Sequence, residues 1–260
     1  LSEEKIQTKR TMVSILAMVV GCFSKAVYIP FLALYWLMPK DKFYSRRQKN
    51  LFKAGIFVLL ILMFASFILP LIGNVTSGAE VGDYRGGDTS QTSQLSMILG
   101  YPLTYTGVLL KSLGTTFASY FIGSKVLANF AYRGIYDGIG YFVVLLTMLF
   151  TFVTDFGMTE KTYDAQMKRK ILMMKIWNAV LIFGTACLVW TALYLDFTPV
   201  GSMVINGVSP RYYLPLIFPL SLIFINQKVR CSMKLENYQS LIAFLMLIGT
   251  GISIYCLMLA

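Results

Sequence analysis

Long apolar runs separated by short clusters of Lys and Arg constrain this chain more than any other feature. The runs over residues 54–72, 176–195 and 241–259 come close to the ~20 residues that an α-helix needs to cross a bilayer. With 57% hydrophobic and only 13% charged residues, a soluble domain of 260 residues could not cover this much apolar surface. The sequence therefore predicts an all-α, polytopic helical transmembrane protein.

Two shorter runs, 140–154 and 213–225, are also predicted to cross the membrane. The first apolar run, residues 11–38, is interrupted by Lys25 and Pro30 and has two interpretations. It could form one long, kinked and tilted span, or a hairpin of two short helices that turns near residues 24 and 25. The sequence leaves both open.

The basic clusters predict the orientation of these spans. More than half of the 23 Lys and Arg residues lie in three segments, 39–53, 156–175 and 227–238, which the positive-inside rule places in the cytoplasm. The segments 73–104 and 196–212 then lie outside. Because these short loops account for most of the net charge of +11, the basic balance does not indicate a nucleic-acid partner.

The segment 105–126 breaks the pattern of full crossings. It carries Lys111 and Lys125, and both of its ends should lie outside if the flanking assignments hold. We interpret it as an interfacial or re-entrant helix. Residues 73–137 are accordingly predicted to form an extracytoplasmic loop with interfacial helices, within a single transmembrane domain over 1–260.

A polar loop before Pro215 carries the first candidate site. Arg211 lies there beside Tyr212 and Tyr213, at the predicted outer interface. A guanidinium in this position can hold a phosphate with two parallel hydrogen bonds, and Tyr212 could stack on a sugar. The alternative is an anchor whose guanidinium reaches lipid headgroups.

Three further residues are candidates by their chemistry. Lys25 interrupts an apolar run and could neutralise a lipid-linked phosphate, or it could simply reach headgroups from a hairpin turn. Asp83 and Asp88 lie in a glycine-rich stretch and could act as a general base or bind a divalent metal. The alternative for both carboxylates is solvated loop charge. The chain has no His, so the usual general base is absent.

Five stretches of the sequence form recognisable motifs: Tyr194 with Phe197-Thr-Pro-Val-Gly201, Ile205-x-Gly207-Val208-x-x-Arg211-Tyr212-x-Leu-Pro215, Lys25-x-x-Tyr28-x-Pro30, the basic loop with Phe43, and Gln94-Leu95-x-x-Ile98-Leu-x-x-Pro102. These motifs resemble a bacterial membrane-protein family known as a domain of unknown function, whose members are similar to the GT-C glycosyltransferases. Ser209-Pro210 stand where family members commonly have Gln-Gly.

The resemblance implies a GT-C-like fold in a bacterial plasma membrane, with this chain as the C-terminal part of a longer protein. It implies a polyprenyl-phosphate-linked sugar as donor and a cell-surface glycan as acceptor. Arg211 and Lys25 would bind the donor phosphate, and Tyr212 and Tyr28 would line the site. The catalytic residue is not assigned, and no cofactor beyond a divalent metal is considered. The alternatives are a non-enzymatic lipid-glycan transporter and a structural partner of a polysaccharide-assembly complex.

Overall fold

The computed structural model describes residues 8–23, 25–77, 88–121, 123–127, 134–135, 138–154, 165–224, 229 and 231–258. Within these ranges the regular structure is helical, apart from one isolated bridge residue at Ile135. The elements are α1 (Thr8–Phe23), η1 (Ala26–Leu37), η2 (Lys40–Lys42), α2 (Arg46–Ser77), α3 (Gln91–Gly100), α4 (Pro102–Phe121), α5 (Ser124–Leu127), α6 (Ile139–Thr154), α7 (Ala165–Phe197), η6 (Pro210–Tyr213), α8 (Leu214–Ile223) and α9 (Leu235–Met258). The predicted all-α class is confirmed.

Three described helices are long and apolar enough to cross a membrane. They lie over Arg46–Asn74 in α2, Met167–Phe197 in α7 and Leu235–Met258 in α9. The shorter apolar helices η1 and α6 have 12 and 16 residues. The predicted transmembrane character is therefore supported. The 20-residue α4 is not among the three, and its interfacial position stays a prediction.

The run over 213–225 forms less helix than its predicted crossing requires. Its α-helix, α8, has 10 residues with Pro219 inside it. Ten α-helical residues extend over about 15 Å, roughly half of a ~30 Å hydrocarbon core. The crossing predicted for this run is therefore not accounted for by α8 alone.

The basic segments are partly helical, and this corrects their assignment as loops. In the segment 39–53, α2 already begins at Arg46. Side chains cap the start of the helix: the Gln48 N–H donates to Ser45 Oγ at 3.1 Å, and the Tyr44 N–H, one residue before the N-cap, donates to Gln48 Oε1 at 2.8 Å. Lys and Arg are good helix formers, so the helix continues beyond the apolar run. Helix α7 extends into its basic segment in the same way.

The first apolar run forms the hairpin rather than one kinked span. Helix α1 ends at Phe23, and η1 returns as a 3₁₀-helix after Lys25. The Lys25 N–H donates to the Cys22 carbonyl at 3.1 Å, which closes the turn. The hydroxyls of Ser14 and Tyr35 form a hydrogen bond between the two arms. Twelve residues are far more than the usual length of a 3₁₀-helix, so this arm is unusual.

The described chain divides into two compact units. Unit 1 comprises Leu1–Leu110 with Phe183–Gly207, and unit 2 comprises Lys111–Ile182 with Val208–Ala260. The division falls within α4, within α7 and inside the loop that follows α7. Each unit is therefore built from segments far apart in the sequence.

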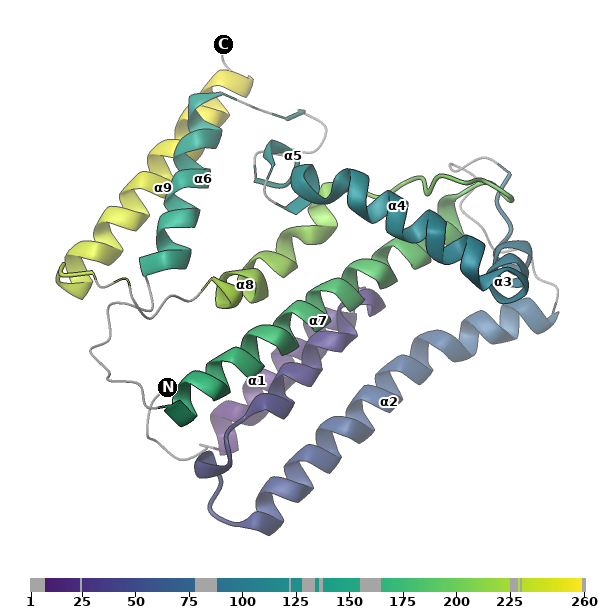
Figure 1. Cartoon of the computed structure of the whole chain (residues 1–260), viewed down its shortest axis with the longest axis horizontal. Coiled ribbons are helices and arrows are strands. Elements are labelled where there is room, and N and C mark those ends of the chain that lie inside the picture. The colour runs from purple at the N-terminus through teal and green to yellow at the C-terminus, as the bar shows by residue number, and fades with distance from the viewer. Residues whose placement is uncertain are drawn as a thin grey trace. The chain divides into compact units, whose positions relative to one another are not determined.

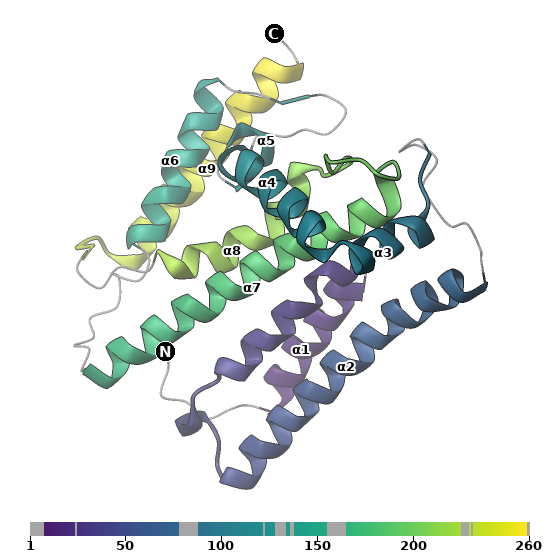
Figure 2. The ribbon, with the colours of Figure 1, turned by 45° about the vertical axis from the view of Figure 1, so that its right-hand side comes forward.

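In unit 1, η1 packs against both α1 and α2 (Figures 1 and 2). The centre of this packing is formed by Cys22, Ile29, Leu32 and Met63, each at most 5% exposed. Burying an apolar side chain of this size away from water stabilises the fold by about 1.5–3 kcal/mol. The gain is smaller where the unburied side chain would contact lipid instead of water.

In unit 2, α6 and α9 lie side by side in both views (Figures 1 and 2). A Cβ at Gly140 would lie 2.3 Å from Ser253 Oγ and 2.6 Å from the Gly249 carbonyl oxygen, so only glycine permits this approach. At the other end of the pair, the hydroxyls of Thr154 and Tyr238 hydrogen-bond at 2.8 Å. Small residues and buried hydroxyls are typical of helix pairs in membranes.

Candidate functional site

Arg211 lies on η6, a single helical turn that leads directly into α8. Pro210 occupies the first position of the turn, where its missing N–H leaves no hydrogen bond unmade. The Tyr212 N–H donates to the Ser209 carbonyl at 3.0 Å. Tyr213 is only 1% exposed, whereas Arg211 is exposed. The Arg211 turn, residues 208–213, is thus anchored by Tyr213 and presents the guanidinium at the surface.

The guanidinium of Arg211 lies over an aromatic ring of the same turn. The Cζ atom of Arg211 lies 5.7 Å from the centroid of the Tyr212 ring. A guanidinium above a ring is attracted by its π face, while its N–H groups point outward in the guanidinium plane. This arrangement leaves those groups able to bind a planar or tetrahedral anion.

A second cation, Lys125, stands on the element that packs against the Arg211 turn. Helix α5 packs against η6, and Lys125 is exposed on α5. The Lys125 Nζ lies 5.9 Å from the Tyr120 ring centroid. The ring centroids of Tyr120 and Tyr213 are 5.8 Å apart, and the Tyr120 hydroxyl donates to the Val208 carbonyl at 3.4 Å. Unit 2 therefore joins two cations and three tyrosines in one neighbourhood.

Lys125 is a candidate site residue that the sequence did not single out. In the sequence it served only as a sign that residues 105–126 do not cross the membrane. Its place just after a tyrosine-rich segment is the sequence feature that could have marked it as a candidate. Its relation to the Arg211 turn depends on packing between elements about 85 residues apart along the chain, which no local pattern reports.

The first half of the loop, residues 198–207, is held within unit 1 by Gln94. This side chain is fully buried, and its Nε2 donates to the carbonyls of Thr198 at 2.9 Å and Pro199 at 3.0 Å. Thr198 is also fully buried; its hydroxyl donates to the Leu193 carbonyl at 3.0 Å and accepts from the Asn206 N–H at 3.1 Å. Two polar side chains therefore fix both ends of the loop.

Two glycines of this loop adopt conformations that other residues avoid. Gly201 has φ of 78° in a turn closed by the Ser202 N–H and the Pro199 carbonyl at 3.1 Å. Gly207 has φ of 77°, and a Cβ there would lie 2.3 Å from Cδ1 of Phe197. Gly207 is therefore required both by its backbone and by the adjacent ring.

The carboxylate candidates have different outcomes. Asp83 lies outside the described residues. Asp88 is exposed, and its carbonyl accepts from the Val200 N–H at 3.1 Å, so the structure joins its segment to the loop that leads to Arg211. Within the described ranges, no three His, Cys, Asp or Glu side chains gather in a way that could hold a metal ion.

Lys25 and Tyr28 lie together at the turn of the α1–η1 hairpin. Lys25 is exposed and Tyr28 is half-buried; the Tyr28 N–H donates to the Lys25 carbonyl at 3.2 Å. Both belong to unit 1, whereas Arg211 and Tyr212 belong to unit 2. That Lys25 and Arg211 bind the same phosphate stays a prediction.

Unit 1 also holds buried oxygen atoms that accept no hydrogen bond from the described chain. Three of them belong to Thr89, Gln91 and Gln94, next to the start of α3, and a fourth belongs to Thr185 of α7. The Gln91 Nε2 donates to Asp196 Oδ1, and Gln94 donates to two carbonyls, so neither amide can be turned without placing oxygen against oxygen. These atoms could accept hydrogen bonds from hydroxyl groups or water.

Comparison with known proteins gives one family. The family model described as "Predicted membrane protein (DUF2142)" matches residues 1–220. These residues include Lys25, Asp88 and the Arg211 turn, whereas α9 lies beyond them. No curated protein and no solved structure matches the chain.

Proposed function

Because the chain belongs to the DUF2142 family of predicted membrane proteins, we propose that it binds a polyprenyl-phosphate-linked sugar and serves in its transfer to a cell-surface glycan. In this proposal it is a GT-C-like glycosyltransferase, or the donor-binding part of one, in a bacterial plasma membrane. The proposal rests on the motif resemblance around Arg211 and on the geometry of the Arg211 turn.

The observation that carries the proposal is the exposed guanidinium on an anchored turn. Tyr213 is buried beneath the turn, Tyr212 lies against the guanidinium, and Lys125 stands on the adjoining element. A preorganised arginine loses less conformational freedom when it binds than a mobile one does. The donor is a phosphodiester with one negative charge, and it becomes a more highly charged phosphate monoester when the sugar leaves, so a second cation suits the phosphate that the reaction releases.

The chemistry gives these cations a role in the reaction itself. Glycosyl transfer breaks the bond between the anomeric carbon and a phosphate oxygen, and the electron pair stays with the phosphate. The new glycosidic bond forms to an acceptor hydroxyl, whose proton leaves to a base. Negative charge on the phosphate rises as the bond breaks, so a guanidinium fixed beside it stabilises the transition state.

Binding of a polyprenyl phosphate tests the first part of the proposal. A partly desolvated charge-assisted pair contributes about 1.5–3 kcal/mol, so Arg211→Ala should weaken binding roughly 10- to 150-fold. Arg211→Lys should also weaken binding, because a point charge cannot reproduce the two-pronged contact. Arg169, exposed on the predicted cytoplasmic side, gives the matched control variants Arg169→Ala and Arg169→Lys. Unchanged binding in both Arg211 variants at normal expression would leave Arg211 as a headgroup anchor.

The second part is tested by sugar release from labelled polyprenyl-phosphate hexoses in membranes containing the full-length protein. Loss of release in Arg211→Ala, with the protein still inserted, supports the transferase. Binding that depends on Arg211 without any sugar release from the wild type would favour the lipid-glycan transporter or the structural partner.

A further inference from the structure

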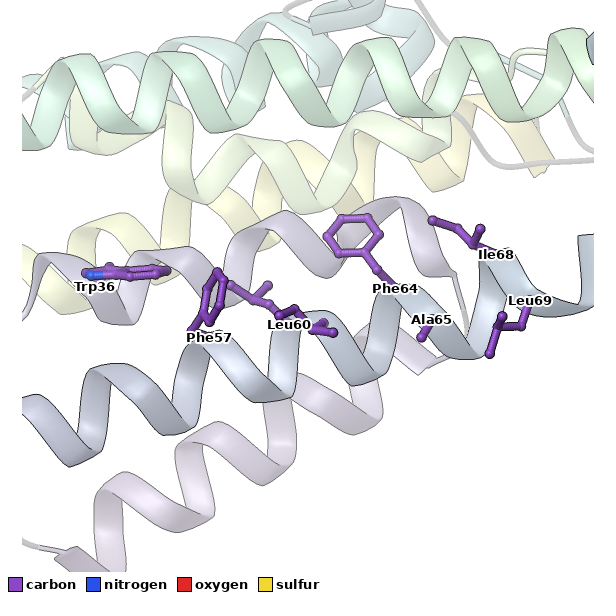
Figure 3. A pocket seen from close by; sticks show the side chains of 8 residues that line it. Trp36, Phe57, Leu60, Phe64, Ala65, Ile68 and Leu69 are labelled. Carbon is purple, nitrogen blue, oxygen red and sulfur yellow. The ribbon is translucent and has the colours of Figure 1, made fainter. Parts of the chain in front are cut away.

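An apolar groove lies between η1 and α2 within unit 1. Its volume is about 530 Å³. Figure 3 shows Trp36 on η1 beside Phe57 at one end, with Leu60 and Phe64 farther along α2 and Leu69 at the other end. Every lining side chain is apolar, and Phe57 is 51% and Leu69 65% exposed. The groove therefore runs along α2, with Trp36 of η1 at one end.

The groove lies on one stripe of α2, and the same stripe is cationic at its start. Lining residues recur every three or four positions from Phe57 onward, as one helix face requires. The same spacing continues backward to Lys53, Lys49 and Arg46. A row of positive charge thus runs into a row of apolar side chains along a single face.

The start of this stripe gathers positive charge from more than one element. Lys40, on η2, lies near enough to the Lys49 ammonium to repel it, as do Arg46 and Lys53. The first turn of α2 contains no acidic residue. A helix N-terminus carries partial positive charge, so these cations are repelled by the helix end as well as by one another. An anion bound at this end would reduce both kinds of repulsion.

The length of the groove indicates how much lipid it could hold. From Phe57 to Leu69, α2 rises by about 18 Å, close to the ~15 Å depth of one bilayer leaflet. This depth suits a single acyl chain whose headgroup stays at the interface. A polyprenyl chain of many isoprene units would extend far beyond it.

From these features we propose that the groove holds one acyl chain of an anionic phospholipid, with its headgroup phosphate on Arg46, Lys49 and Lys53. The lipid comes from the leaflet next to the segment 39–53, predicted to be cytoplasmic. Trp36 closes the headgroup end, the depth at which tryptophan concentrates in membrane proteins. This proposal does not depend on the proposed donor site.

Trp36 provides the measurement, because it lines the groove. In the variant with Trp177→Phe and Trp190→Phe, Trp36 is the remaining tryptophan of the three. The protein is placed in phosphatidylcholine vesicles that contain a small fraction of phosphatidylglycerol or phosphatidylcholine brominated on the acyl chains. Half-quenching of Trp36 fluorescence should need at least about fivefold less brominated phosphatidylglycerol, as expected for one or more lysines near an anionic headgroup.

Three variants separate a specific site from general lipid contact. Lys49→Gln with Lys53→Gln should abolish the preference for phosphatidylglycerol, and about 1 M salt should weaken it in the parent protein. Lys168→Gln with Lys170→Gln, at exposed positions in the first two turns of α7, should leave it unchanged. Ala65→Phe should reduce quenching by both lipids, because it fills the groove while the charges remain.

The proposal is overturned by any of three results. Equal quenching by the two brominated lipids would mean ordinary lipid contact. Displacement of brominated phosphatidylglycerol by a polyprenyl phosphate more strongly than by unbrominated phosphatidylglycerol would assign the groove to the carrier. No quenching by either lipid would mean that protein, such as a second copy of this chain, covers the groove.

Discussion

At the scale of single residues, Arg211 gains its character from its neighbours rather than from the sequence position alone. Tyr213 buries one side of the turn, and the Tyr212 ring lies against the guanidinium. Lys125 approaches from α5 by way of the Tyr120 ring. The sequence indicated Arg211 and Tyr212 through their motif. It could not indicate Lys125, because tertiary packing alone joins α5 to η6.

Lys125 should contribute to phosphate binding, but less than Arg211. It is an exposed point charge, and exposed pairs are typically worth about 0.2–1 kcal/mol, so Lys125→Ala should weaken polyprenyl phosphate binding by up to about fivefold. Lys111→Ala, at an exposed lysine of α4, should change binding little. If the two cations share one phosphate, the losses in Lys125→Ala and Arg211→Ala should be non-additive. Strict additivity would argue for two separate roles.

Gly207 and Gly201 should differ in their tolerance of a methyl group. Both have positive φ, which costs a non-glycine residue about 1–3 kcal/mol. Only at Gly207 does the new Cβ also meet the Phe197 ring, since nothing lies within 4 Å at Gly201. Gly207→Ala should therefore lower the thermal unfolding midpoint in detergent more than Gly201→Ala does. Equal midpoints would mean that the ring moves aside without loss.

At the scale of elements, the apolar runs predicted which segments are helical but not how far each helix extends. Helix α2 starts at Arg46 because Ser45 and Gln48 cap it, and this pattern is readable in the sequence once loop assignments are set aside. Helix α3 is less readable. Its Gln94 is buried because it donates hydrogen bonds to two carbonyls about 104 residues away in the chain. A local hydrophobic pattern predicts that a polar residue is exposed, so it could not predict this burial.

The pair of α6 and α9 should separate when its glycine contact is filled. A side chain at Gly140 meets the backbone of α9 at 2.6 and 2.8 Å, so Gly140→Val must push the helices apart. At Gly251, on the other face of α9, nothing lies within 4 Å. A disulfide-crosslinking assay between cysteines placed on α6 and α9 should lose efficiency in Gly140→Val and keep it in Gly251→Val. Equal crosslinking would show that the pair does not depend on the close contact.

At the scale of the whole molecule, orientation in the membrane connects the two proposals. The donor site needs the Arg211 turn outside, and the lipid groove needs the segment 39–53 in the cytoplasm. Both follow from the distribution of Lys and Arg. The predicted topology includes a crossing by residues 213–225, but α8 is too short to span the membrane alone. The orientation of the C-terminal part therefore needs its own measurement.

Labelling of single cysteines from outside intact cells measures this orientation. In a background with Cys22, Cys187, Cys231 and Cys256 replaced by serine, a membrane-impermeant reagent should label Asp88→Cys and not Arg47→Cys. Val200→Cys should behave like Asp88→Cys, because the two backbones are hydrogen-bonded. Labelling of Arg47→Cys alone would invert the map and place the Arg211 loop in the cytoplasm.

The 3₁₀ conformation of η1 makes the two arms of the hairpin, α1 and η1, about equal in length. The 16 residues of α1 extend over about 24 Å at the α-helical rise, and the 12 residues of η1 extend over about 24 Å at the larger 3₁₀ rise. Rewound as an α-helix, η1 would shorten to about 18 Å. The two arms of the hairpin would then differ in length, and the basic cluster that follows η1 would lie closer to the hydrocarbon core. The unusual winding thus sets the depth at which those charges stand.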